Sequence, residues 1–285
     1  MPAIEKYYIS CDLEGITGIS NFREMNEQKA YASKMMTDDV KVIASSINQV
    51  CLKSGLKFDE IEIIIADSHS LGTNINLPDL PSNVKLIRGF PRPYYMSPTL
   101  SDDINAIFFA GYHSKIGSLE GGMDHTFSNS VIYRVLINDS EVGEFEINAA
   151  LAGHYNIPVA FASGDDNFIN QIEYLKNKLS FETVVTKESI SRCAAKLYHP
   201  EKVHAEMAQK VQKTLIEKNW AKKIFKYEYP LKARIELTNT LKADLAALIP
   251  SLKRTDGRSV EFTAPDFPYF YNMLCAITMI GWADK

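Results

Sequence analysis

Four side chains of the kinds that bind transition metals follow three short apolar runs of the sequence. They are Asp12, Glu14, His69 and His113. Carboxylates and neutral imidazoles together suit zinc, for which manganese or cobalt can substitute. Each side chain alone has an ordinary explanation, because a carboxylate after a strand often caps a turn and a lone histidine is usually a structural residue. Their repetition at three run ends favours one shared metal site.

The apolar runs themselves predict strands of a single sheet. They span residues 7–11, 61–66 and 106–110, and they are rich in isoleucine, phenylalanine and tyrosine. Near-continuous apolar strands are typical of a parallel sheet that is covered on both faces. Ligands bind beyond the carboxyl ends of the strands in such open sheets. We therefore expect an α/β fold with a mostly parallel central sheet and flanking helices, and with the four donors at one edge of that sheet.

The apolar spacing also predicts several helices. Thr37 is a good N-cap for a helix that Gly55 would end. Later in the chain the pattern predicts helices over residues 189–197 and 201–219, and then an alternation of strands and helices that closes with an apolar helix over 267–280. That last helix has more large side chains than one core face needs, so we expect it either to contact another subunit or to be buried within its own.

The character of the chain changes after Glu188. We expect residues 1–188 to form a metal-binding α/β catalytic domain and residues 189–285 to form a smaller C-terminal α+β portion. The boundary is soft, and one continuous domain is the alternative.

The composition excludes several kinds of function. A hydrophobic share of 46% is that of an ordinary globular protein, and a net charge of −4 without a basic run argues against nucleic-acid binding. No apolar run approaches the roughly 20 residues of a membrane helix, and the N-terminus lacks the pattern of a signal peptide. The four cysteines form no CxxC pair, which indicates reduced thiols. We expect a cytoplasmic protein that binds neither nucleic acid nor membranes.

Four further acidic or basic residues leave alternatives open. His125 lies in a glycine-rich loop, where an acid–base role and a surface position fit about equally well. Glu144 and Glu146 both lie near a helix start, where a carboxylate also favours the helix dipole, and the pattern does not choose between them. Asp67 precedes His69 by two residues and is a candidate to orient that imidazole.

A second acidic motif, Gly164-Asp165-Asp166, gives a superficial likeness to the haloacid-dehalogenase phosphatases, which hold magnesium. Those enzymes have an aspartate two residues after the nucleophile, where Glu14 stands here, and they do not use histidines at strand ends. We interpret Asp166 as a helix N-cap.

Taken together, these segments resemble the zinc-dependent D-aminopeptidase family of the DppA type. The matching stretches are Ser10-Cys11-Asp12-Leu13-Glu14-Gly15-Ile16-Thr17-Gly18, Ala66-Asp67-Ser68-His69-Ser70, Gly111-Tyr112-His113, Met123-Asp124-His125-Thr126, Val142-Gly143-Glu144 and Gly164-Asp165-Asp166. The likeness runs from the first strand to at least Ser191, and more loosely to the C-terminus. No single motif decides it, but their order and spacing together are specific.

The resemblance implies a metal-dependent aminopeptidase that hydrolyses short peptides, with an N-terminal D-amino acid, by a water activated between two zinc ions per chain. The implied ligands, with Asp12 bridging, are Asp12, Glu14, His69, His113 and Glu144. The implied catalytic residue is His125, and Glu144 is preferred over Glu146 on this basis alone. Asp124 departs from the small residue that commonly precedes the catalytic histidine, so it is expected to tune His125 or to alter the substrate charge preference. Homo-oligomers, typically decamers, are also implied.

Two rival functions remain beside the peptidase. The same ligands would suit a two-metal phosphoesterase or another amide hydrolase, because they could clamp a phosphate or a different amide. A non-catalytic metal-binding assembly protein is the rival from another class. The complete ligand set and His125 argue against that last interpretation.

Overall fold

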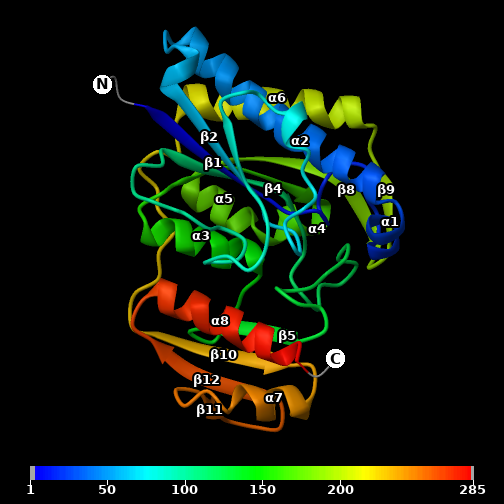
Figure 1. Cartoon of the computed structure of the whole chain (residues 1–285), viewed down its shortest axis with the longest axis vertical. Helices are drawn as coiled ribbons and strands as arrows, with labels where there is room; N and C mark the ends of the chain where they lie inside the picture. The colour runs from blue at the N-terminus through cyan, green and yellow to red at the C-terminus, as the bar shows by residue number, and fades with distance from the viewer. Residues whose placement is uncertain (1–3, 284–285) are drawn as a thin grey trace.

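The computed structural model describes residues 4–283, which form two sheets with helices packed against them (Figure 1). The larger sheet has the strand order β3-β2-β1-β4-β7-β8-β9. Its neighbouring strands are parallel except for the β8–β9 pair, which confirms the mostly parallel α/β fold. The strands are β1 (Glu5–Cys11), β2 (Ile61–Asp67), β3 (Val84–Ile87), β4 (Ala106–Tyr112), β7 (Val159–Asp165), β8 (Glu182–Ser191) and β9 (Ala194–Leu197).

Helices cover both faces of this sheet, as the apolar strands predict (Figure 1). On one face Ile9 and Phe108 pack in a core with α2 (Lys29–Lys53) and α6 (Pro200–Glu217). On the other face Tyr8 and Phe109 pack in a core with α3, α4 and α5. The remaining bounds are α1 (Phe22–Glu27), η1 (Phe58–Glu60), η2 (Leu77–Asp79), α3 (Glu144–His154), α4 (Asp166–Gln171) and α5 (Glu173–Leu179).

The smaller sheet has the order β11-β12-β10-β5-β6, and its strand pairs are antiparallel. Helix α8 lies between this sheet and the rest of the molecule, and it packs on α3 as well as on β10 and β12 (Figure 1). One core therefore extends from the larger sheet into the smaller one. The elements are β5 (Ile132–Ile137), β6 (Ser140–Glu141), β10 (Leu231–Leu237), α7 (Thr240–Ala246), β11 (Lys253–Arg254), β12 (Ser259–Ala264) and α8 (Phe267–Gly281).

The expected boundary at residue 188 falls inside β8, a strand of the larger sheet. Helix α6 also belongs to the larger sheet, and β5 and β6 in the middle of the chain belong to the smaller one. The division of the chain into residues 1–188 and 189–285 stays a prediction.

Two predicted helices differ from the structure. Helix α2 begins at Lys29 and not after Thr37, because Ala32, Met35 and Met36 already lie on its buried face. Thr37 hydrogen-bonds within the helix to the carbonyl of Ser33. The predicted helix over 189–197 is wrong, since these residues end β8 and form the antiparallel partner β9.

No helix within residues 4–283 is long and apolar enough to cross a membrane.

Candidate metal centre

The turn after β1 packs directly on the end of β4. The backbone N–H of Asp12 donates to the carbonyl of Ala110 (2.9 Å), and that of Gly15 donates to the carbonyl of Gly111 (2.8 Å). A Cβ at Gly15 would lie 1.8 Å from the carbonyl oxygen of Tyr112, so only glycine fits there. This close approach brings both carboxylates of the turn beside the residues that follow β4.

Strand β8 holds the same turn through a buried lysine. Nζ of Lys187 donates to the carbonyl oxygens of Glu14 and Ile19, each at 2.6 Å. The hydroxyl of Thr186 donates to the carbonyl of Gly15 at 2.6 Å. Burial lowers the pKa of Lys187 to about 8, partly offset by Asp165 and other carboxylates. Lys187 was not predicted from the sequence, because its partners are backbone carbonyls far away in the chain.

Two clusters of donors lie at the carboxyl edge of the larger sheet, and each could hold a metal ion. In the first cluster Nδ1 of His69 lies 3.3 Å from Oδ1 of Asp12 and 3.0 Å from Oε2 of Glu14. Both carboxylates are almost fully buried. The end of β2 supports this arrangement, because the N–H of Ser68 donates to the carbonyl of Cys11 (2.8 Å).

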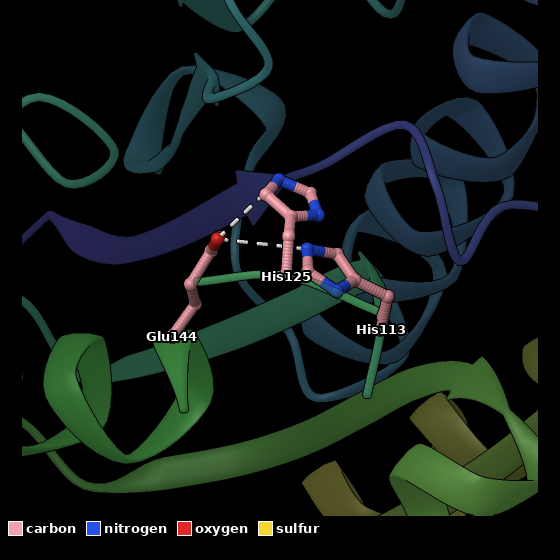
Figure 2. A group of neighbouring side chains, drawn as sticks. All are labelled: His113, His125 and Glu144. Atoms are coloured by element: carbon pink, nitrogen blue, oxygen red, sulfur yellow. Dashed lines mark ion pairs between the residues drawn. The ribbon is translucent and has the colours of Figure 1, made fainter. Parts of the chain in front are cut away.

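The second cluster contains His113, His125 and Glu144 (Figure 2). Oε1 of Glu144 lies 3.6 Å from Nε2 of His113 and 3.7 Å from Nε2 of His125. Oδ2 of Asp12 lies 3.4 Å from Nε2 of His113, while its other oxygen faces His69. Asp12 therefore stands between the two clusters.

The hydrogen bonds of His113 test whether a cation fits this cluster. Its Nδ1 is 2.9 Å from the carbonyl of Ser114, which requires the ring proton to be on Nδ1 and leaves Nε2 as an acceptor in the neutral ring. Nε2 is buried and has no hydrogen-bond partner among the described residues. An unpartnered acceptor that faces carboxylate oxygens fits a divalent cation, and imidazole with carboxylate is a zinc-type donor set.

The buried carboxylates and imidazoles of the two clusters shift one another's pKa values. Burial opposes ionisation of Asp12, but the neighbouring imidazoles of His113 and His69 hold its pKa well below the usual range. Burial by itself would lower the pKa of His69, but Glu14 and Asp12 raise it well above its usual value. The same balance, led by Glu144, raises the pKa of His113. The buried carboxylates of Asp12, Glu14 and Glu144 thus favour a positive charge among them.

His125 lies in a loop that is fixed by contacts to other segments. Its Nδ1 lies 3.0 Å from the carbonyl of Met123, so that Nε2 faces Glu144. The carboxylate of Asp124 forms an ion pair with Arg192 (2.9 Å) and accepts from the N–H of Gly117 (2.7 Å). Asp124 is thus not part of the cavity lining, and its expected effect on His125 or on the substrate charge preference stays a prediction. The sequence analysis missed Arg192.

The other open positions have distinct environments. Glu146 accepts a hydrogen bond from the N–H of Gly143 (3.1 Å) at the start of α3, and it lies outside both clusters. The carboxylate of Asp67 bonds to Asn74 and not to the imidazole of His69. The side chain of Asn74 in turn donates to the carbonyl of His69 (3.1 Å). Asp67 therefore positions the loop and does not orient the ring directly.

The N-cap of α4 lies one residue before Asp166, the N-cap that the sequence predicts. Asp165 accepts from the N–H of Phe168 (2.9 Å) and is the N-cap, while Asp166 accepts from the N–H of Ser189 (2.8 Å).

A cavity of about 450 Å³ opens onto the clusters. The His125 side chain lines it and is 13% exposed, whereas His113 is 1% exposed and is not part of the lining. No lysine or arginine lines the cavity in the described part of the chain. Its lining residues include Asp12, Glu14, His69, His125 and Glu144 from the clusters, and Phe22, Met25, Phe90, Tyr95, Phe127, Ser128 and Trp282 around them.

The fold and these clusters together define an α/β protein with two candidate cation sites at the strand ends of a parallel sheet. The chain belongs to the D-aminopeptidase family Peptidase_M55, whose family model matches residues 6–276. This assignment confirms the expected family and makes the protein a peptidase of the aminopeptidase kind.

A similarity in sequence and a similarity in structure support the assignment. The D-aminopeptidase of Bacillus subtilis (strain 168) is 30% identical over 281 residues, which cover 97% of this chain and 97% of that protein. The structure of the Zn-dependent D-aminopeptidase DppA from Bacillus subtilis, a self-compartmentalizing protease, superposes with a TM-score of 0.87 at 28% identity. That comparison covers 97% of this chain and 98% of the other.

Proposed function

We propose that the protein is a zinc-dependent aminopeptidase that removes an N-terminal D-amino acid from short peptides with two zinc ions per chain. The observation that carries this proposal is the position of Asp12 between the two donor clusters, with one oxygen toward His69 and the other toward His113. Family membership and the zinc dependence of the similar DppA structure support it.

Five side chains would hold the two ions. Asp12, Glu14 and His69 would bind the first ion. Asp12, His113 and Glu144 would bind the second, because Nε2 of His113 lies 3.4 Å from Asp12 and 3.6 Å from Glu144. When bound, zinc lowers the pKa of water toward neutrality and polarises a carbonyl group.

His125 would act on the substrate and not as a permanent ligand. Its side chain lines the cavity, whereas His113 is turned to the buried carboxylates alone. The contact of Nδ1 to the carbonyl of Met123 fixes the ring with a proton on Nδ1. Once Nε2 has also taken up a proton, it would donate a hydrogen bond to the developing oxyanion or pass that proton to the leaving amine. The alternative is that His125 binds the second cation. Metal analysis of the His125→Ala variant distinguishes the two roles.

The cavity would favour the amino end of a peptide. Its lining contains the carboxylates of Asp12, Glu14 and Glu144 and no lysine or arginine among the described residues. Because these carboxylates would bind the two zinc ions, the free amino group of a short peptide would bind one of the ions or a nearby carboxylate oxygen. Such a contact would make the protein an exopeptidase that recognises the N-terminus.

The proposal is tested with a substrate panel on metal-analysed protein. D-dipeptides, L-dipeptides and p-nitrophenyl phosphate are compared before chelation, after it, and with added zinc, cobalt or manganese. We expect up to two ions per chain and hydrolysis of D-dipeptides that disappears with chelation and returns with metal. Phosphate ester hydrolysis alone would establish the phosphoesterase, and no turnover at full metal content would establish a binding protein.

We further propose that the chain assembles into a homo-oligomer in the cytoplasm, with a decamer as the expected size. The self-compartmentalizing relative supports assembly. The cysteines are all free, two of them buried, as expected of a reducing compartment. A light-scattering mass equal to one chain at micromolar concentration would contradict the oligomer.

A further inference from the structure

Aromatic side chains from separate segments meet in the metal cavity. We call Phe90, Tyr95 and Trp282 the aromatic wall, and all three line the same cavity as the metal donors. The ring centroid of Phe90 lies 6.0 Å from that of Tyr95 and 6.3 Å from that of Trp282. The three rings therefore form one continuous apolar surface.

The chain holds Trp282 firmly in place. Its Nε1–H donates to the hydroxyl of Ser128, another lining residue, at 2.9 Å. A Cβ at Gly281 would lie 2.3 Å from a methyl carbon of Val131, so the end of α8 can approach this segment only with glycine. Nζ of Lys242 donates to the carbonyl of Gly281 (2.9 Å) and so caps the last turn of the helix.

Tyr95, at the other end of the wall from Trp282, is fixed as well. The guanidinium of Arg92 donates to the carbonyls of Tyr95 (2.5 Å) and Asp67 (2.6 Å), and it lies 5.5 Å from the centre of the Tyr95 ring. The wall is thus a preorganised surface, and little conformational entropy is lost when a ligand packs on it.

We propose that the aromatic wall is a specificity subsite that takes an apolar side chain of a residue flanking the scissile bond. This rests on the proposed peptidase function. A side chain bound here shares the cavity with the metal donors, so it must belong to a residue next to the bond that is cleaved. With Asp12, Glu14 and Glu144 engaged by the zinc ions, the lining has no lysine or arginine among the described residues to pair with an acidic side chain. The surface that remains for recognition is the apolar wall.

Trp282 is the member of the wall whose substitution tests the subsite. It lies beyond residues 6–276, the range that the family model matches. We expect the identity of residue 282 to set preference among apolar side chains without changing the metal clusters.

The test compares Trp282→Ala and Trp282→Phe with the wild-type protein in two substrate series. The first series varies the N-terminal D-residue among Ala, Leu and Phe in p-nitroanilides. The second keeps D-Ala first and varies the following D-residue among the same three in dipeptide amides. Tyr133→Ala is the matched control, because Tyr133 is an exposed aromatic residue of the smaller sheet that does not line the cavity.

In one of the two series Trp282→Ala should lower kcat/KM for the Leu and Phe substrates by about tenfold or more relative to the Ala substrate. The change should arise mainly through KM. Trp282→Phe should restore part of the preference. The zinc content of both Trp282 variants and the substrate preference of Tyr133→Ala should match those of the wild type. Trp282→Ala should also raise the inhibition constant of free D-leucine more than that of free D-alanine. Unchanged selectivity in both series, with peptide hydrolysis intact, would overturn the subsite. Absence of peptide hydrolysis in the wild type would instead contradict the proposed function.

Discussion

The imidazole rings of His113 and His125 stack face to face, with centroids 4.2 Å apart and an angle of 7° between their planes. One ring is buried against carboxylates and the other lines the cavity. Two neighbouring histidines with the same acidic partner, Glu144, are thus proposed to have different roles.

Substitution of each histidine separates these roles. We expect His113→Ala to lose metal and activity together, because it removes a ligand. His125→Ala should keep nearly full metal content while kcat falls by roughly 100-fold or more, with a smaller change in KM. Metal analysis and steady-state kinetics measure both effects, and His199→Ala at an exposed site is the control. A metal-depleted His125→Ala protein would identify His125 as a ligand.

Replacement of the buried Lys187 tests how the β1 turn is held. Lys187→Met removes the two hydrogen bonds to the carbonyls of Glu14 and Ile19 and leaves these acceptors buried. We expect the free energy of unfolding to fall by about 2 kcal/mol and zinc affinity to weaken. Denaturant unfolding and a competitive zinc titration measure the two changes. Lys41→Met on the exposed face of α2 should alter neither, and equal effects of both variants would contradict the assigned role.

Arg192 should act as a positioning residue for His125. It pairs with Asp124, and its guanidinium lies 5.6 Å from the centre of the Phe22 ring, which in turn contacts the ring of His125. We expect Arg192→Ala to lower kcat by about tenfold with unchanged metal content, since a misplaced acid–base group costs rate and not ligation.

The control for Arg192 is the double variant with Asp124→Asn. If the ion pair carries the effect, the double variant should be no slower than Arg192→Ala alone. Additive losses, or loss of metal from either single variant, would argue against a positioning role.

His204 should make stability depend on pH. Its Nε2 lies 2.8 Å from the buried carboxylate of Asp39, which also accepts from the N–H of Thr17. The hydrogen bond to Asp39 raises the pKa of His204 above its usual value of 6.5. Because the folded pKa is the higher one, the stabilisation is complete below the unfolded pKa and is lost as pH rises through the folded pKa. Wild type should therefore exceed His204→Gln in stability by more at pH 6 than at pH 9 in denaturant unfolding. An equal difference at both values would exclude this ion pair.

Continuous apolar runs were sufficient to predict three of the parallel strands, β1, β2 and β4, and the donors at their ends. Asp12, Glu14, His69 and His113 could be placed together because parallel strands end at one edge of the sheet. Glu144 and His125 could be selected only through the family resemblance, since helix starts and loops do not specify direction. Lys187 could not be found, because its partners are backbone carbonyls about 170 residues away in the chain. Residues 189–197, the end of β8 with β9, were mistaken for helix because they have neither strong alternation nor a continuous apolar run.

The pairing of β5 with β10 has a consequence for synthesis on the ribosome. Ile137 emerges 94 residues before Leu231, the first residue of the strand that will cover the open edge of β5. At a rate of about 5–20 residues per second, β5 waits roughly 5–20 seconds for this partner. Nascent chains stalled before residue 231 should therefore be cut by protease near residues 132–137, while chains stalled after α8 has emerged should resist. During that interval a strand edge that ends up inside the finished protein is open to chaperones or to a neighbouring nascent chain.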